Sequence, residues 1–277
     1  MTGEVRGPSR TAPFVAPGSV VRTIWGDADV VLLVFAGAAA EFALNRAVDW
    51  LFFTGAIPAD PIGRLFRTAA YAQEIVFASR ATAERTLARI RAAHSAVERA
   101  RDARIPDWAH RDVLYLLIDY SERAHALLRG PLTPEQRNDL YDVFRRVGNG
   151  LDVQQLPRAY DDWRVDRDRH MRRDLAYGAH TSALYARYRA ELGALRYTLL
   201  RRVQSLLVPP FVADLLGLRR SAWAPAAVRA HRAARALRLA PVVRAALVPR
   251  QYLARVREMD RVSGRWSFSA STGPRTA

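Results

Sequence analysis

Apolar residues return every three to four positions through most of the chain, a spacing typical of amphipathic helices. One such stripe consists of Ala83, Leu87, Ile90, His94 and Val97, and the opposite face of the same segment carries mainly arginine. No segment alternates apolar and polar residues as a half-buried strand does. The pattern therefore predicts an all-α protein with a single large globular domain of about ten helices.

The segment from Asp60 to Thr68 carries the most informative helix start. An Asp side chain before a helix accepts one of its unpaired amides, and Pro61 at the first helical position loses no hydrogen bond. Arg64, Arg67 and Thr68 then follow at i, i+3 and i+4. This spacing places two guanidinium groups and one hydroxyl within one turn of the predicted helix.

Other capping and stop signals bound the remaining helices. The expected segments are 20–25, 28–45, one from Ser79 or Thr82 to about 101, 108–129, 133 to about 150, one that starts at 156–157, 181–207, 210–218, 225–237 and 241–261. The segment 28–45 is apolar nearly all round, and its alanines and glycine at 36–40 permit another helix to approach closely. We expect this helix to be buried on almost every side.

The two ends of the chain lack helical periodicity. Residues 1–16 are expected to form a flexible arm, 17–262 the folded domain and 263–277 a disordered tail. The start has no apolar stretch of the kind found in signal peptides. The most apolar run, 30–40, is shorter than the roughly 20 residues that a membrane-spanning helix needs. The prediction is a cytoplasmic protein whose surface is compatible with peripheral contact to a membrane.

The chain has 43 basic and 27 acidic residues, a formal net charge of +16, and all of its basic residues are arginine. This charge suits an anionic partner such as a lipid surface. Nucleic acid is disfavoured, because the arginines are spread over every expected helix instead of clustering on one element. The absence of cysteine excludes disulfides, iron–sulfur clusters, thiolate-bound haem and cysteine zinc sites. The six histidines include no pair at helical spacing, which disfavours a polyhistidine metal centre on one helix.

His94 is the candidate ligand that the apolar pattern singles out. An imidazole on a buried helix face needs a partner, because an unpaired buried polar group costs about 1–3 kcal/mol. A backbone carbonyl or a carboxylate would make His94 a satisfied core histidine. A metal ion would make it a ligand. The pattern alone leaves both interpretations open.

Several motifs in this order resemble one known family. They are PGSVVRTIWGD at 17–27, the Ala/Gly-rich helix after it, DPIGRLFRTAAYAQEIVFAS at 60–79, RIRAAHSAV around His94, GPLTPEQRNDLYDVFRRVG at 130–148 and QLPRAYDDW at 155–163. In this order and separation the chain resembles, over about residues 17–250, the catalytic domain of the rubber oxygenases and mycophenolic-acid oxygenases (MpaB-like).

The resemblance implies an all-helical domain that holds haem b, an iron cofactor, and uses O₂ to cleave double bonds of a hydrophobic, isoprenoid-type small molecule. It implies His94 as the iron ligand. Arg64, Arg67 and Thr68 match the distal Arg-x-x-Lys-Thr motif of the rubber oxygenases and are implied to act in catalysis, by polarising O₂ or, for the arginines, by pairing the haem propionates. The alternatives are an ion pair on the helix surface for each arginine and a backbone hydrogen bond for Thr68. An apolar tunnel between helices would hold the alkene.

Two positions depart from the family pattern. Arg67 stands in place of the lysine and stays charged, so it cannot ligate iron, and the resemblance then implies an open or water-filled distal position. Tyr115 stands where many members have a histidine in a Trp-Val-His run. The alternative function is a haem-free, catalytically silent helical protein that binds a lipid or protein partner through its Arg-rich faces.

Overall fold

The computed structural model of the chain describes residues 11–48, 50, 52, 60–219, 224–237, 239, 241–242, 244 and 248–260. Within these residues the elements are helical, with two isolated β-bridges and no strand, which confirms the predicted all-α fold. The helices are α1 (Val20–Trp25), α2 (Ala28–Phe42), α5 (Pro61–Phe77), α6 (Arg80–Arg101), α7 (Asp107–Arg129), α8 (Pro134–Gly150), α9 (Tyr160–Asp174), α10 (Ala179–Leu207), α11 (Pro210–Leu215) and α12 (Ala224–Ala236), with 3-10 turns η1 (Arg46–Val48) and η2 (Arg250–Tyr252).

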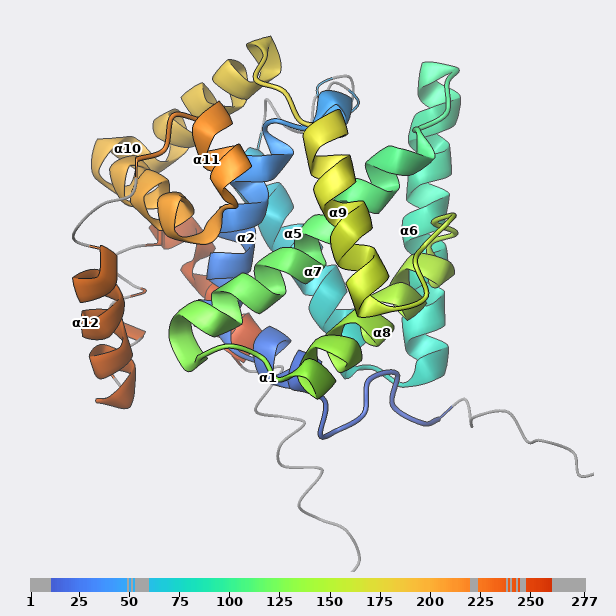
Figure 1. Ribbon diagram of the computed structural model, residues 1–277, viewed down its shortest axis with the longest axis horizontal. Helices are drawn as coiled ribbons and strands as arrows, with labels where there is room; N and C mark the ends of the chain where they lie inside the picture. The colour runs from blue at the N-terminus through green and yellow to red at the C-terminus, as the bar shows by residue number, and fades with distance from the viewer. Residues whose placement is uncertain are drawn as a thin grey trace, which may run out of the picture.

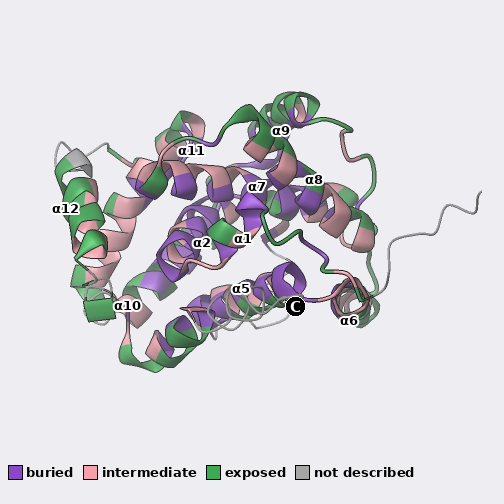
Figure 2. Cartoon of the chain, turned by 90° about the horizontal axis from the view of Figure 1, so that it is seen from below, coloured by how far each residue is buried: buried purple, intermediate pink, exposed green. Residues whose placement is uncertain are grey.

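Helix α2 lies at the centre of the fold, as its uniform apolarity predicts. It crosses α7 (Figure 1), and in Figure 2 it lies between α7 on one side and α5 on the other. Gly37 makes the crossing with α7 close, because a Cβ atom at this position would lie 2.2 Å from a ring carbon of Tyr120. The small residues of α2 therefore set how near the two central helices approach.

The remaining helices cover this centre. Helices α8 and α9 pack on α7, whereas α6 packs on α5 and α8 at one side of the molecule (Figures 1 and 2). Helix α10 packs on α2, α5 and α7, with α12 outside it. Helix α5 therefore packs against α6 in one direction and against α2 and α10 in another.

Helix starts with local caps are confirmed. The side chains of Asp60, Ser79 and Thr133 each accept a hydrogen bond from the first turn of α5, α6 and α8, and Thr133 forms the predicted capping box with Gln136. Within the described part of the chain, no helix is both long and apolar enough to cross a bilayer.

Two helix bounds differ from the prediction, and one predicted helix is interrupted. Helix α9 begins at Tyr160 and not at 156–157, because the Pro157 carbonyl accepts the Tyr141 hydroxyl and the chain bends there. Helix α2 ends at Phe42, since the Asn45 side chain accepts the Ala47 amide and turns the chain. The predicted helix 181–207 exists, but it is interrupted at Gly193, whose φ of 73° is non-helical.

Part of the predicted N-terminal arm is packed. Phe14 and Val15 are buried, and the amide of Phe14 donates to the carbonyl of Ala78. The carbonyl of Ala12 accepts from the amide of Arg80. These contacts fix residues 12–15 against the junction of α5 and α6. Residues 1–10 and the predicted tail 263–277 lie outside the described residues.

Candidate functional site

At the start of α5, Arg67 forms an ion pair with the cap residue Asp60. The Asp60 side chain accepts the Gly63 amide at 2.8 Å, and its other oxygen pairs with Arg67 Nη1 at 3.0 Å. Both side chains of this pair are nearly half exposed. Burial alone would raise the pKa of Asp60, but its hydrogen bonds, first that from Arg67, lower it. Arg67 is therefore a partner of the helix cap in this conformation.

Thr68 and Arg64 lie one turn apart on the same stripe of α5. The Thr68 hydroxyl donates to the Arg64 carbonyl at 3.1 Å, an interaction within the helix that leaves the hydroxyl oxygen able to accept. The Arg64 guanidinium is half-buried, and among the described residues no group forms a hydrogen bond or ion pair with it. Burial lowers the pKa of Arg64, and the charge of Arg67 lowers it further.

His94 of α6 faces His110 of α7. The two ring centroids lie 4.8 Å apart with the planes tilted by 39°. Burial, followed by repulsion from His110 and Arg64, lowers the pKa of His94 to about 4. Burial lowers the pKa of His110 as well. Both imidazoles are therefore neutral at physiological pH, the form in which an imidazole binds a metal.

Arg64, His94 and His110 together form what we call the His94 cluster. It unites α5, α6 and α7, and within the described chain none of its three side chains forms a hydrogen bond or ion pair with a protein group. Among the described residues, His94 thus has no acceptor of the kind that a satisfied core histidine would bind. A neutral imidazole beside an unpaired guanidinium has the donor chemistry that haem binding needs, an iron ligand and a partner for an anionic oxygen. The donor set thus fits the cofactor that the sequence implies.

Sequence reasoning brought Arg64 and His94 together but missed His110. The helical spacing of α6 and α7 separately gives no reason to pair two histidines 16 positions apart. Tyr115, at the departure from the family pattern, is fully buried and donates to Asp166 at 2.7 Å. Burial, then the hydrogen bond to Asp166, raises its pKa above the ordinary range. Tyr115 therefore packs as a neutral phenol against α9.

A second polar group, Asp112, His170 and Asp174, was also missed. His170 Nδ1 lies 2.9 Å from Asp174 Oδ2 and 3.2 Å from Asp112 Oδ1, and all three residues are buried. Such a set could hold a metal ion. However, Arg173 Nη2 lies 2.9 Å from the same His170 nitrogen and also donates to Asp174. The charge of Asp174 is thus balanced by Arg173, whereas Asp112 accepts a hydrogen bond from Asn45 and keeps a buried Oδ1 without a hydrogen bond among the described residues. The i, i+4 spacing of His170 and Asp174 was the available signal.

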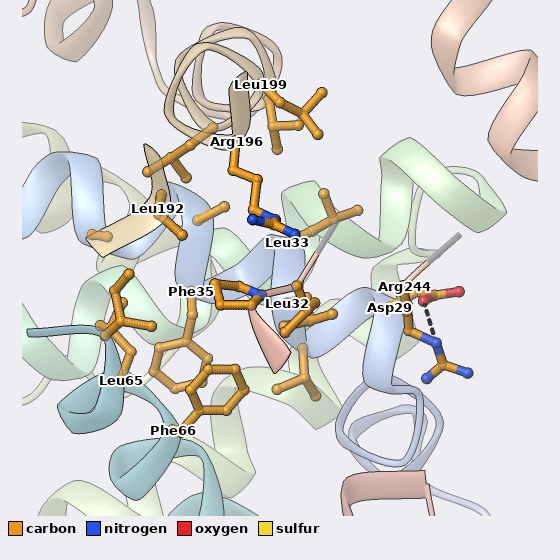
Figure 3. A pocket seen from close by; sticks show the side chains of 18 of the residues that line it. Asp29, Leu32, Leu33, Phe35, Leu65, Phe66, Leu192, Arg196, Leu199 and Arg244 are labelled. Atoms are coloured by element: carbon orange, nitrogen blue, oxygen red, sulfur yellow. Dashed lines mark ion pairs between the residues drawn. The ribbon is translucent and has the colours of Figure 1, made fainter. Parts of the chain in front are cut away.

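An apolar cavity of about 240 Å³ lies on the other side of α5 (Figure 3). Helices α2, α5 and α10 line it together with residues 244–259. Its α5 residues are Ile62, Leu65, Phe66 and Ala69. At 100° per residue these positions lie away from the stripe of Arg64 and Thr68, and neither of those two residues lines the cavity. Helix α5 therefore separates the cavity from the His94 cluster.

Comparison with known proteins agrees with the sequence pattern. Residues 22–245 match the family model described as "ER-bound oxygenase mpaB/B'/Rubber oxygenase, catalytic domain". Neither the curated proteins nor the solved structures give a match. Because the matched region spans most of the chain, the protein belongs to the mpaB and rubber oxygenase catalytic-domain family.

Proposed function

We propose that this protein is a haem b-dependent oxygenase that acts with O₂ on a hydrophobic, isoprenoid-type small molecule. Family membership supports oxygenase activity in general. The observation that carries the proposal for this chain is His94, a neutral imidazole without a protein partner in the described residues, beside an unpaired Arg64.

In this proposal His94 holds the iron through a ring nitrogen. Its pKa of about 4 keeps that nitrogen unprotonated throughout the physiological range. The haem, when bound, would supply the binding and activation of O₂. His110, packed against the His94 ring, would fix the orientation of that ring.

Arg64 is proposed to donate charge-assisted hydrogen bonds, to a haem propionate or toward O₂. Its guanidinium is available for this role, since no described protein group occupies it. Thr68 would add a hydroxyl on the same stripe. Arg67 would have to leave Asp60, with which it pairs at 3.0 Å, before it could act there. We therefore assign Arg64 the larger role and keep Arg67 and Thr68 as further proposed catalytic residues.

The alternative, a silent protein that binds a partner through Arg-rich faces, has less support. Arg235 pairs with Asp27 and Asp29, and Arg244 pairs with Asp29 and Asp260. These arginines of the C-terminal region are occupied within the chain. The cytoplasmic location, with or without peripheral membrane contact, stays a prediction from the sequence.

The decisive measurement is an absorption spectrum of protein expressed with added haem precursor. We expect a Soret band in the parent, its loss or strong shift in His94→Ala, and no change in His180→Ala, which removes an exposed histidine. Absence of the band from the parent would refute haem binding. If the band survives in His94→Ala and disappears in His110→Ala, the protein binds haem, but the iron ligand is His110 of α7.

A further inference from the structure

The cavity on the far side of α5 has the form of a binding site for a chain-like apolar molecule. Three helices contribute its walls, and their side chains are aliphatic or aromatic; among them are Leu33, Phe35, Leu65, Phe66, Leu192 and Leu199. Its volume of about 240 Å³ equals the liquid volume of about eight water molecules. A methylene group takes a similar volume, so the cavity suits a tail of about eight to ten carbons.

One charged side chain, Arg196, enters this apolar space without a partner from the described part of the chain. Figure 3 shows Arg196 extending from α10 toward Leu33. The Nε atom of Arg196 is buried and lacks a hydrogen bond, and in the described chain no group pairs with its guanidinium. A buried donor without a hydrogen bond costs free energy until an acceptor reaches it. Arg196 therefore provides an attachment point for an anionic group inside an otherwise apolar cavity.

The other charged groups of the lining are already paired with one another. Asp29 lies 3.3 Å from Arg244 Nε and 3.6 Å from His231 Nε2. Arg235, outside the lining, adds a contact of 2.6 Å to the same carboxylate. Figure 3 shows Asp29 and Arg244 together at one side, away from Arg196. Among the described residues, this end carries no spare cation for a second anionic group.

We propose that the cavity binds a single-chain amphiphile with a medium-length apolar tail and one carboxylate head, and that Arg196 recognises the head. A planar guanidinium matches a carboxylate through two parallel hydrogen bonds. A diphosphate head is disfavoured because it would need further cations, and Arg235 and Arg244 are occupied by Asp29. The site goes beyond the proposed oxygenase function and does not depend on haem, since α5 separates it from His94.

The test is calorimetric titration of delipidated, haem-free protein with decanoate, decanol and decyl phosphate below their micelle concentrations. We expect decanoate to bind at least tenfold more tightly than decanol. Arg196→Gln should weaken decanoate at least tenfold and change decanol less than twofold. Arg189→Gln removes the same charge from an exposed position of α10 outside the cavity, and it should change neither.

A second variant tests the tail. Ala36→Leu places a larger side chain into the lining from α2 and should weaken decanoate and decanol alike. Thermal melting verifies that each variant is folded. The proposal is overturned if decanoate does not bind the parent, if Arg196→Gln and Arg189→Gln have equal effects, or if decyl phosphate binds more tightly than decanoate. Because no haem is present, these outcomes are independent of the test on His94.

Discussion

Two clusters of polar side chains inside this helical domain differ in whether described protein groups form hydrogen bonds and ion pairs with them. Between α2, α7 and α9, Arg167 Nη2 lies 2.6 Å from Glu41 and 3.1 Å from Asp119, and the Tyr120 hydroxyl donates to Glu41 at 2.9 Å. Arg123 Nε contacts the other oxygen of Asp119 at 2.6 Å. We call this set the Glu41 network. Each of its charges has an opposite charge in contact.

The His94 cluster is the opposite case. Its guanidinium and its two imidazoles come from three helices, as the members of the Glu41 network do. No described group forms a hydrogen bond or ion pair with them, and the charge of Glu98 acts on both imidazoles only from a longer range. Burial alone would lower the pKa of Arg167, yet Glu41 and Asp119 outweigh it and raise that pKa, whereas the pKa of Arg64 is lowered. The comparison teaches that the fold supplies partners for every charge of the Glu41 network, whereas the His94 cluster has no hydrogen-bond or ion-pair partner among the described residues, which is why we propose a ligand there.

The largest expected effect is a loss of stability when the Glu41 network is broken. Arg167→Met leaves Glu41 and Asp119 buried without their shared cation, and breaking a buried pair in this way costs about 3–5 kcal/mol. For a domain of this size the melting temperature should fall by about 6–20 °C. Calorimetry or thermal circular dichroism measures the change.

The matched control is Arg169→Gln on the same helix, whose pair with Asp166 has an arginine that is 67% exposed. Exposed pairs contribute less than about 1 kcal/mol. An Arg167→Met protein that melts within a degree of Arg169→Gln would show that the Glu41 network does not stabilise the fold.

The next effect is a loss of folding stability at acidic pH. The pKa of His94 is about 4 in the fold against an ordinary value of 6.5. Between these values the unfolded chain binds a proton that the folded chain does not, so stability falls as the pH drops from 6.5 toward 4. At pH 4.5 His94 should destabilise the haem-free protein by about 2–3 kcal/mol relative to pH 7.

Urea unfolding of the parent and of His94→Ala at both pH values isolates this contribution. The parent should lose more stability on acidification than the variant, because the other titrating groups are common to both. Parallel losses in the two proteins would contradict a desolvated, unpartnered imidazole at this position.

The sequence predicted local features well because their causes are local. Asp60 and Thr133 cap their helices through contacts within three residues, and the glycine of α2 permits the close crossing that its composition indicates. His94 was singled out as a candidate ligand from the periodicity of one helix together with the family resemblance, and that role stays a prediction. Each of these signals is readable without knowing which helices meet.

Features that depend on helix contacts were not predictable in the same way. Arg167 lies in a segment where Asp and Arg residues are interleaved, a pattern typical of a solvated face with ion pairs, but its side chain is only 7% exposed and reaches Glu41, 126 positions earlier. His110 approaches His94 only because the chain reverses direction between α6 and α7. The packing of α10 on α2 and α5 places Arg196 where no described group pairs with it. In each case the partner, or its absence, is set by the tertiary fold.

The smallest effect separates two arginines that lie one turn apart. Arg67→Gln removes an exposed pair with Asp60 and should lower the free energy of unfolding by less than about 1 kcal/mol. Arg64→Met replaces a guanidinium that has no protein partner within the described residues by an apolar side chain of high helix propensity. It should leave the stability of the haem-free protein unchanged or raise it by up to about 1 kcal/mol, because a desolvation cost disappears. Chemical denaturation of both variants measures the sign of the change in the free energy of unfolding for each. If Arg64→Met instead destabilised the protein more than Arg67→Gln, Arg64 would stabilise the fold itself, and the His94 cluster would resemble the Glu41 network.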